Sequence, residues 1–172
     1  MPLYTIEHST PLSKPQRDAL AQSITHIHTR KFTTPSLFVN VQFVDSAHYC
    51  NYIAGKERPI NRILAHVRSG GNRTTSDFED LARKIESAWN DIVNAGSVKH
   101  LDKEERKARE LNRVFILGAI TAGLECGVLL PRAGGDSTWL KDNMAVFEGR
   151  ARKGDEDFIE LLEEMKNRED LQ

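Results

Sequence analysis

The sequence predicts an α+β fold in which two tandem βαβ units form one four-stranded mixed sheet, with two helices on one face. Strand-like, helix-like and strand-like stretches follow one another in residues 2–45, and the same order returns in residues 60–120. The chain has 172 residues, 39% of them hydrophobic, which suffices for one core of ordinary size. We therefore expect one domain in residues 1–135 and a C-terminal helical extension in residues 136–172.

The first unit begins with a strand-like stretch from Leu3 to Ser9. The next residues, Ser13-Lys14-Pro15-Gln16, have the form of a capping box with proline in the first turn, and they predict the start of a helix. Apolar residues recur at helical spacing from Leu20 to Ile27, and the basic pair Arg30-Lys31 favours a helix C-terminus. Residues Leu37–Asp45 then alternate in polarity, as a strand does.

The second unit repeats this order. Ile63–Arg68 is strand-like, Thr74–Asp77 can cap a helix, and Val114–Ile120 supplies the closing strand. Right-handed crossovers in both units place both helices on the same face of the sheet. The other face needs a partner, and symmetric self-association usually supplies one. The helix between the strands carries an apolar stripe made of Phe78, Leu81, Ile85, Trp89 and Ile92.

Two segments lie outside the repeats. The charged run Lys99–Glu110 is expected to be a solvated helical insertion before the last core strand. After Pro131 comes a tail with an acidic amphipathic helix at Asp155–Met165, expected to pack on the core or on a neighbouring subunit.

Composition excludes several classes of partner. Twenty-four basic and 25 acidic side chains leave a net charge of -1, which gives no overall field toward nucleic acid or anionic lipid. The longest apolar stretches are too short or too rich in glycine to span a bilayer. We expect a soluble cytoplasmic protein in which Cys50 and Cys126 remain thiols, with no metal site and no cofactor.

Pro2 is the first candidate for chemistry. Methionine before a small residue is normally removed, which would leave the secondary amine of Pro2 at the chain terminus. An ordinary α-amine has a pKa near 8, and burial or a nearby cation lowers it, so that the amine becomes a base near neutral pH. Many unrelated proteins also begin with Met-Pro, and the other candidates therefore matter.

Four further side chains are candidates, each with a structural alternative. Arg68 and Arg73 flank a glycine-rich turn and could bind a small carboxylate, or they are surface residues. His28 and His26 are two residues apart on one helix, which argues against a shared zinc site; His28 is either functional or a satisfied structural histidine. Glu125 stands among apolar residues and is either functional or an exposed turn residue.

The ordered set of these residues resembles the tautomerase superfamily, and within it the cis-3-chloroacrylic acid dehalogenase branch. The resemblance covers roughly residues 2–140. It includes the helix motif Ser23-Ile24-Thr25-His26-Ile27-His28 and the segment Leu124-Glu125-Cys126-Gly127. It implies a homotrimer in which Pro2 is the acid or base, His28 and the two arginines bind the substrate carboxylate, and Glu125 activates water.

The chain also departs from that branch. Phe115 stands where the branch has a water-assisting tyrosine, so the ring remains at this substrate-binding position without its hydroxyl. The loop between the arginines is longer, Val128 replaces an arginine, and the insertion at Lys99–Glu110 is foreign to the branch. These differences count against efficient dehalogenation more than against the fold or the proline chemistry.

The resemblance implies cofactor-free hydration, dehalogenation or tautomerisation of a small unsaturated or 2-oxo carboxylic acid. If Phe115 prevents water activation, keto–enol tautomerisation of a 2-oxo acid would remain. Two alternatives have no catalysis: a trimeric βαβ binding module, and an interaction protein derived from an inactive enzyme. A retained Met1 would block the amine and favour both of these alternatives.

Overall fold

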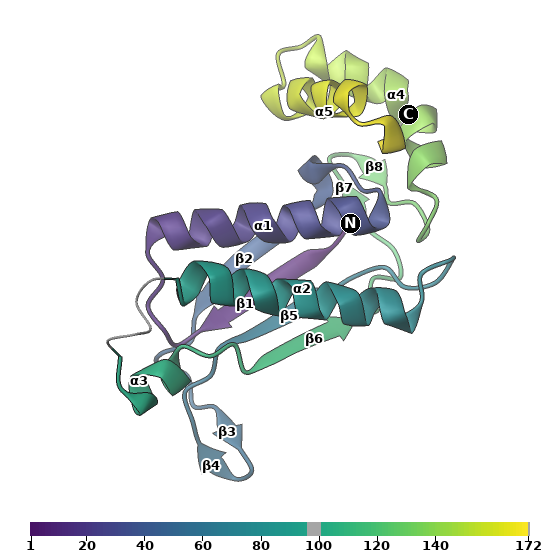
Figure 1. Ribbon diagram of the computed structural model, residues 1–172. Coiled ribbons are helices and arrows are strands. Elements are labelled where there is room, and N and C mark those ends of the chain that lie inside the picture. The colour runs from purple at the N-terminus through teal and green to yellow at the C-terminus, as the bar shows by residue number, and fades with distance from the viewer. Residues whose placement is uncertain (96–100, 172) are drawn as a thin grey trace.

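The computed structural model describes residues 1–95 and 101–171 (Figure 1). The first βαβ unit consists of β1 (Leu3–His8), α1 (Lys14–Phe32) and β2 (Asn40–Asp45). The second consists of β5 (Arg62–His66), α2 (Thr75–Val93) and β6 (Arg113–Leu117). The remaining elements are η1 (Ser36–Phe38), β3 (Tyr52–Ile53), β4 (Lys56–Glu57), α3 (Lys103–Ala108), β7 (Leu124–Glu125), β8 (Val128–Leu129), α4 (Asp136–Ala151), α5 (Glu156–Asn167) and η3 (Glu169–Leu171).

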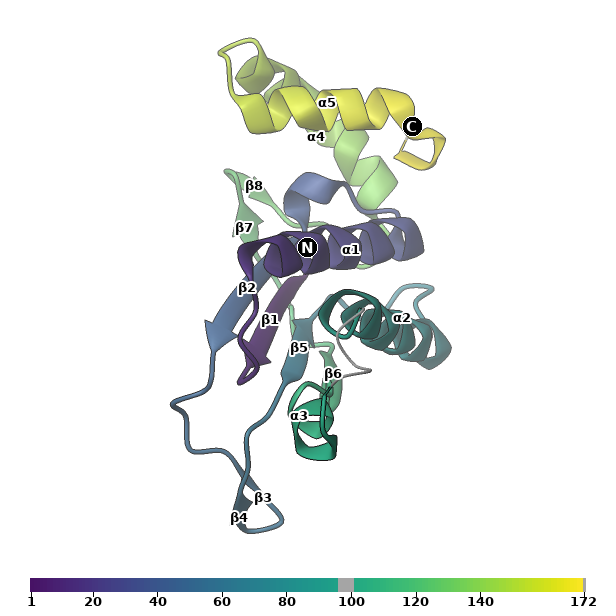
Figure 2. The same ribbon diagram turned by 60° about the vertical axis from the view of Figure 1, so that its left-hand side comes forward.

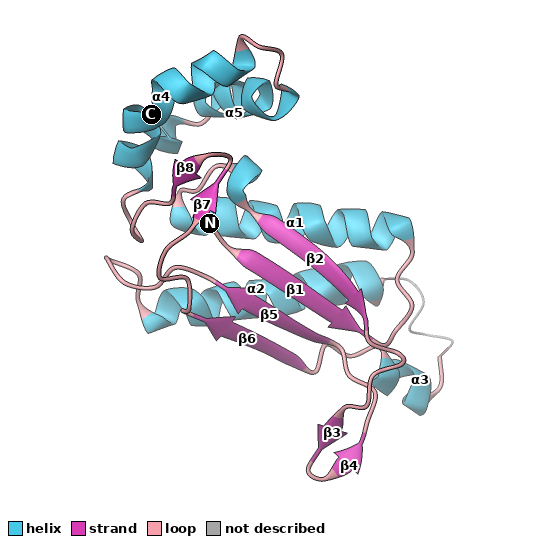
Figure 3. Cartoon of the chain, turned by 180° about the vertical axis from the view of Figure 1, so that it is seen from behind, coloured by secondary structure: helices cyan, strands magenta, loops and turns pink. Residues whose placement is uncertain are grey.

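The main sheet has the order β2-β1-β5-β6. Strands β1 and β2 are parallel, β5 and β6 are parallel, and β1 runs antiparallel to β5, with Tyr4 opposite Ala65. Helices α1 and α2 cover one face, and no helix of the described residues covers the opposite face (Figure 3). The predicted mixed four-stranded sheet with two helices on one face is therefore confirmed.

Both long helices begin at the predicted capping boxes. The Ser13 hydroxyl accepts from the Gln16 backbone N–H while the Gln16 side chain accepts from the Ser13 backbone N–H. Thr74 and Asp77 make the same reciprocal pair at the start of α2. These bonds satisfy N–H groups that have no partner within the helix, which is why the two starts could be located from the sequence.

Several boundaries differ from expectation. The strand expected from Leu37 begins only at Asn40, because Ser36–Phe38 forms a 3-10 helix instead. This helix directs the Phe38 side chain into a second apolar cluster. The closing strand ends at Leu117. The expected insertion at Lys99–Glu110 contains the short helix Lys103–Ala108, and its first residues, 99 and 100, lie outside the described part of the chain.

The larger core lies between the sheet and helices α1 and α2. Tyr4, Ile6 and Ile63 from the sheet and Leu20 and Trp89 from the helices are fully buried there. Alternate residues of each strand point to this core, while Leu3, Phe115 and Leu117 on the other face are exposed. Every second residue of the strands and the residues on one face of each helix therefore pack together in a single core layer.

A second apolar cluster holds the C-terminal helices, which lie at the end of the sheet where β1 begins (Figure 2). The expected amphipathic helix is present as α5 and buries Phe158, Leu161 and Met165. Helix α4 was not predicted; it buries Trp139, Leu140 and Phe147. Met1 and Phe38 join this cluster from the other end of the sequence, and its described members are Met1, Phe38, Val128, Trp139, Leu140, Phe147, Phe158, Leu161, Met165 and Leu171. We call these residues the C-terminal cluster.

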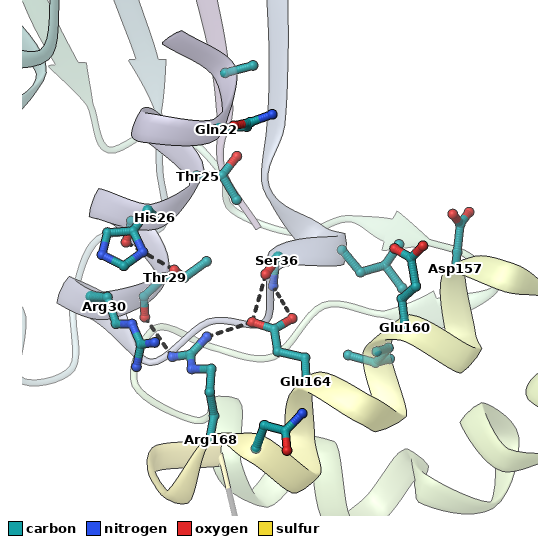
Figure 4. Close-up of a pocket in the computed structure, with 14 residues that line it drawn as sticks. Gln22, Thr25, His26, Thr29, Arg30, Ser36, Asp157, Glu160, Glu164 and Arg168 are labelled. Atoms are coloured by element: carbon teal, nitrogen blue, oxygen red, sulfur yellow. Dashed lines mark hydrogen bonds and ion pairs between the residues drawn. The ribbon is translucent and has the colours of Figure 1, made fainter. Parts of the chain in front are cut away.

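A groove of about 670 Å³ separates α1 from α5, and hydrogen bonds and an ion pair join Thr29, Ser36, Glu164 and Arg168 within it (Figure 4). The Arg168 guanidinium is buried and donates to the carbonyl oxygens of Thr29 and Thr34, at 3.0 and 3.1 Å. It also pairs with Glu164 at 2.8 Å, and that carboxylate accepts from the Ser36 hydroxyl at 2.7 Å. Because these charges are paired within the chain, we interpret the groove as the attachment of α5 to the body of the fold.

None of the helices formed by the described residues is long and apolar enough to cross a membrane.

Candidate active site

The beginning of the chain is buried at one end of the sheet. Pro2 is buried, and its carbonyl oxygen accepts from the Asn40 N–H at 3.1 Å, which extends the parallel pairing of β1 and β2 by one bond. The pKa of the Met1 α-amine is lowered to about 5, chiefly by burial and also by the Arg68 and Arg73 guanidiniums, while Asp136 and Glu125 act in the opposite direction. The chain terminus therefore lies among four of the charged groups that could carry chemistry.

The two candidate arginines meet at one carboxylate. Arg68 Nη2 lies 2.6 Å from Asp136 Oδ1 and Arg73 Nη2 lies 3.3 Å from Asp136 Oδ2, with all three side chains at most 4% exposed. Arg68 also donates to the carbonyl oxygens of Pro131 and Arg132, at 2.8 and 3.0 Å. Neither arginine is the surface residue that the structural alternative proposed.

The glycine-rich loop brings the arginines together. Gly71 has φ +64°, and a Cβ atom there would lie 2.5 Å from the Ala133 carbonyl oxygen. Only glycine fits this close approach, which packs the loop after β5 against the segment that leads into α4. The same contact brings Asp136, the first residue of α4, to the guanidiniums.

His28 lies inside the helix-covered face of the sheet, with 1% of its surface exposed. The Tyr4 hydroxyl and His28 Nδ1 are hydrogen-bonded at 2.7 Å. Burial lowers the pKa of His28 to about 3, and the positive charges of Arg73, the chain amine and Arg68 add to the effect. His28 is thus a neutral imidazole next to the candidate site.

Arg73 connects this histidine to the charged cluster. Its guanidinium carbon lies 4.5 Å from the centre of the Phe32 ring, a cation–π contact, and the Phe32 ring packs against His28 at 4.9 Å. Burial and the neighbouring Arg68 lower the pKa of Arg73. The guanidinium of Arg73 is therefore held by the Phe32 ring on one face and by hydrogen bonds from its N–H groups to Asp136 and to the Arg68 carbonyl oxygen.

Glu125 lies in the hairpin formed by β7 and β8 and is half-buried. The turn between the strands consists of Cys126 and Gly127, with φ of 53° and 84°, the left-handed pair typical of a tight hairpin. Glu125 Oε1 accepts from Asn40 Nδ2 at 2.8 Å. Asn40 therefore holds the carboxylate through its side chain and Pro2 through its backbone.

Phe115 is not near these groups within one chain. It lies in the middle of the edge strand β6, 46% exposed on the face that carries no helix, opposite Leu64. A place for Phe115 in the site would need a neighbouring subunit, so its substrate-binding role stays a prediction.

Two cavities flank the arginine–aspartate cluster. One, of about 400 Å³, is lined by Phe32, Arg73, Asp136 and their neighbours. The other, of about 720 Å³, is lined by Arg68 and by the segments 118–123 and 129–133. A small acid has room on either side of the buried charges.

Asp136 was missed by the sequence reasoning. It follows Gly134-Gly135, and an acidic residue after two glycines is a common signal for the start of a helix. That signal could have located α4. It could not have shown that this carboxylate neutralises Arg68 and Arg73, because the contact depends on how the loops pack.

Comparison with known families gives one match. Residues 1–143 match the model of the Tautomerase_3 family, whose description reads "Putative oxalocrotonate tautomerase enzyme". The match extends past residue 135 into α4 and so includes Asp136. A comparison with curated protein sequences finds no significant match.

Solved structures share the fold. The crystal structure of N1, a member of the cis-3-chloroacrylic acid dehalogenase family, has a TM-score of 0.65 at 24% identity, covering 92% of this chain and 99% of that one. MIF2 of Leishmania major has a TM-score of 0.54 at 15% identity and covers 76% and 97% of the two chains. Pt0534 inactivated by 2-oxo-3-pentynoate has a TM-score of 0.50 at 16% identity, with coverages of 73% and 94%. At these identities the likeness establishes the fold alone.

Proposed function

The chain belongs to this tautomerase family, and from that premise we propose an enzyme that uses the amine of Pro2, freed by removal of Met1, to move a proton on a small carboxylic acid. The observation that carries the proposal is the buried chain start among Arg68, Arg73, His28 and Glu125. The substrate is an unsaturated or 2-oxo acid, and the chemistry needs no cofactor.

The Pro2 amine acts as the base. Without Met1 it lies next to the surroundings that lower the pKa of the Met1 α-amine, burial first and Arg68 second, and we expect them to lower the pKa of the Pro2 amine in the same direction. A base with a pKa below the working pH accepts a proton from a carbon next to a carbonyl group and returns it at a second position. Tautomerisation of a 2-oxo acid requires no other reacting group from the protein.

The arginines bind the substrate carboxylate. Two guanidiniums against the single carboxylate of Asp136 leave one net positive charge, which favours a monocarboxylic acid. Asp136 also holds the two guanidiniums in fixed orientations, which lowers the entropy lost on binding. His28, neutral at working pH, is available as a hydrogen-bond partner next to Arg73.

Hydration or dehalogenation would need a second base for water. Glu125 serves this role in the proposal, with Asn40 orienting its carboxylate. Water would attack one carbon of the unsaturated acid while Pro2 delivers a proton to the adjacent carbon. Phe115 lacks the hydroxyl that would assist this water, so tautomerisation is the activity we expect to dominate.

We place the enzyme in a homotrimer. The sheet face without helices carries the exposed side chains of Leu3, Phe115 and Leu117, and threefold assembly would cover it. Light scattering at micromolar concentration should give three times the chain mass. A monomer at that concentration would contradict the assembly.

Asp136 favours one other reading. Its carboxylate is already paired with both arginines, and such an internal ion-pair cluster would also be present in a trimeric binding module that catalyses no reaction. The two readings differ at the chain terminus, because only the enzyme needs a free Pro2 amine. Intact mass with Met1 retained, and no turnover, would support the binding module.

The decisive experiment separates the two chemistries with Glu125→Gln, which keeps the side-chain shape but cannot accept a proton. Hydration of an acetylenic acid or dehalogenation of a 3-haloacrylate should fall about 10²–10⁴-fold, while tautomerisation of a 2-oxo acid should persist. The exposed Glu163 on α5 provides the matched control, and Glu163→Gln should change neither rate. Equal loss of both activities with the fold intact would contradict the role of Glu125.

Two further variants test the remaining roles. Pro2→Ala leaves a primary amine on a more flexible terminus and should impair both activities. Phe115→Tyr adds the missing hydroxyl and should raise hydration if its absence limits that reaction.

A further inference from the structure

Met1 connects the candidate active site to the C-terminal cluster. Its side chain belongs to that cluster, and the residue is 3% exposed. Its amine lies among the charges of Arg68, Arg73, Asp136 and Glu125. Met1 thus combines a terminal amine that is affected by the charged groups with an unbranched apolar side chain that belongs to the C-terminal cluster.

Pro2 is held by strand pairing in which Met1 takes no part. The Asn40 N–H donates to the Pro2 carbonyl oxygen at 3.1 Å, and Leu3 follows directly in the β1–β2 ladder. Removal of Met1 therefore leaves Pro2 where it is and frees the space next to its nitrogen.

Other members of the C-terminal cluster are held in place by a hydrogen bond and by ring packing. Trp139 Nε1 donates to the Leu129 carbonyl oxygen at 2.6 Å, and the Trp139 ring packs against Phe38 and Phe147 with centroids 5.2 and 5.6 Å apart. Phe38 and Phe147 are fully buried. Close-packed walls relax only partly when a side chain is removed, and an apolar cavity stays dry and binds apolar molecules.

We propose that removal of Met1 opens an apolar subsite against α4 and α5, which binds the unbranched tail of a straight-chain carboxylic acid. The inference rests on the proposed function and adds the substrate class: 2-oxo or unsaturated acids whose chain is about as long as a methionine side chain. The Met1 thioether chain stands in for the tail.

In this proposal the C-terminal helices contribute to substrate binding. A carboxylate held by Arg68 and Arg73 and a tail held by the C-terminal cluster would fix the substrate at both ends of its reacting carbons. Short acids would bind only through their heads.

The first test uses acids that cannot react, so that it does not depend on catalysis. Butanoate, hexanoate and octanoate are titrated by calorimetry into the chain lacking Met1, with the N-terminus verified by intact mass. Affinity should rise about fourfold for each added methylene group until the subsite is filled. The chain that retains Met1, expressed with the methionine aminopeptidase inhibited, should show no dependence on chain length.

The second test measures turnover. Deuterium incorporation next to the 2-oxo group, followed by NMR, gives kcat/KM for 2-oxobutanoate, 2-oxohexanoate and 2-oxooctanoate, and it should rise from the four-carbon to the six-carbon acid and then level off. Val128→Phe adds a ring inside the cluster and should reduce the ratio of the long-chain to the short-chain value at least tenfold. Ile159→Phe, at an exposed position of α5, is the control and should keep the ratio.

The outcomes of the two tests distinguish a failure of the proposed subsite from a failure of the proposed enzymatic function. Octanoate that binds no more tightly than butanoate to the chain lacking Met1 overturns the subsite, whatever Val128→Phe does. Turnover of 2-oxo acids without any effect of chain length also overturns it and leaves the proposed function standing. Tight binding of octanoate without turnover of any 2-oxo acid supports the subsite and contradicts the proposed function.

Discussion

The two apolar cores of this protein are built in different ways. The core between the sheet and helices α1 and α2 takes its residues from regular repeats within each element. The C-terminal cluster collects single residues from distant parts of the chain, from Met1 and Phe38 to Phe147 and Leu171. The first core follows local periodicity, whereas the second exists only once the sheet is formed.

The candidate active site lies where these two cores meet. Pro2 and His28 come from the body of the fold, and Asp136 comes from the first turn of α4. Arg68 and Arg73 are bound to Asp136, so the charged site depends on the position of the C-terminal helices. The body of the fold therefore carries most of the candidate reacting groups, and the C-terminal extension contributes the carboxylate that pairs with Arg68 and Arg73.

The largest expected effect tests whether the two cores unfold separately. Phe147→Ala removes a fully buried ring that packs against Phe38, Trp139 and Phe158, and should destabilise the C-terminal cluster by about 3–5 kcal/mol. Hydrogen exchange should become faster in α4 and α5 while the amides of β1 and β5 stay protected. The matched change Ile85→Ala, in the first core, should lower protection throughout the chain. Equal loss of protection in both variants would mean one cooperative unit.

The second prediction concerns the ion pairs that join the body of the fold to helix α4. Asp136→Asn leaves the guanidiniums of Arg68 and Arg73 buried side by side without their carboxylate, and should lower stability by about 3 kcal/mol. Chemical denaturation measures the change. Asp142→Asn, at an exposed position of the same helix, should stay within about 0.5 kcal/mol of the parent. Little effect of Asp136→Asn would show that the ion pairs contribute nothing net.

The third prediction concerns acid stability. The pKa of His28 is lowered to about 3 in the folded chain, from an ordinary value of 6.5, by burial and by Arg73, the chain amine and Arg68. Below pH 6.5 the unfolded chain binds a proton that the folded chain does not, so stability should fall with decreasing pH, by about 1.4 kcal/mol per pH unit, down to about pH 3.

The variant His28→Gln should reduce this slope, because its side chain does not titrate and can still bond the Tyr4 hydroxyl. His48→Gln, at an exposed position, should leave the slope unchanged. Denaturant midpoints between pH 4 and 7 measure both. An unchanged slope in His28→Gln would show that another group is responsible.

The smallest expected effect is confined to the body of the fold. Thr74→Ala removes the capping box of α2 and should cost about 1 kcal/mol of unfolding free energy. Thr75→Ala, one residue later and exposed, keeps the cap and should stay within about 0.5 kcal/mol. Neither change should affect hydrogen exchange in α5. A loss of protection there would show that the two cores are more closely coupled than their packing indicates.

Local rules in the sequence determined most of the body. The capping boxes at Ser13 and Thr74 located the starts of α1 and α2, because their hydrogen bonds join residues three apart. Alternating polarity located the strands to within a few residues. The order of Pro2, His28, Arg68, Arg73 and Glu125 along the chain was enough for the resemblance that named them as candidates.

Only the tertiary structure decided the rest. The partnership of Asp136 with Arg68 and Arg73 joins residues more than sixty positions apart, and no local rule connects them. Met1 and Phe38 enter the C-terminal cluster for the same reason: an apolar side chain packs against whatever surface the folded chain brings near it. Sequence therefore determined which residues could react, and long-range packing decided which carboxylate and which apolar walls surround them.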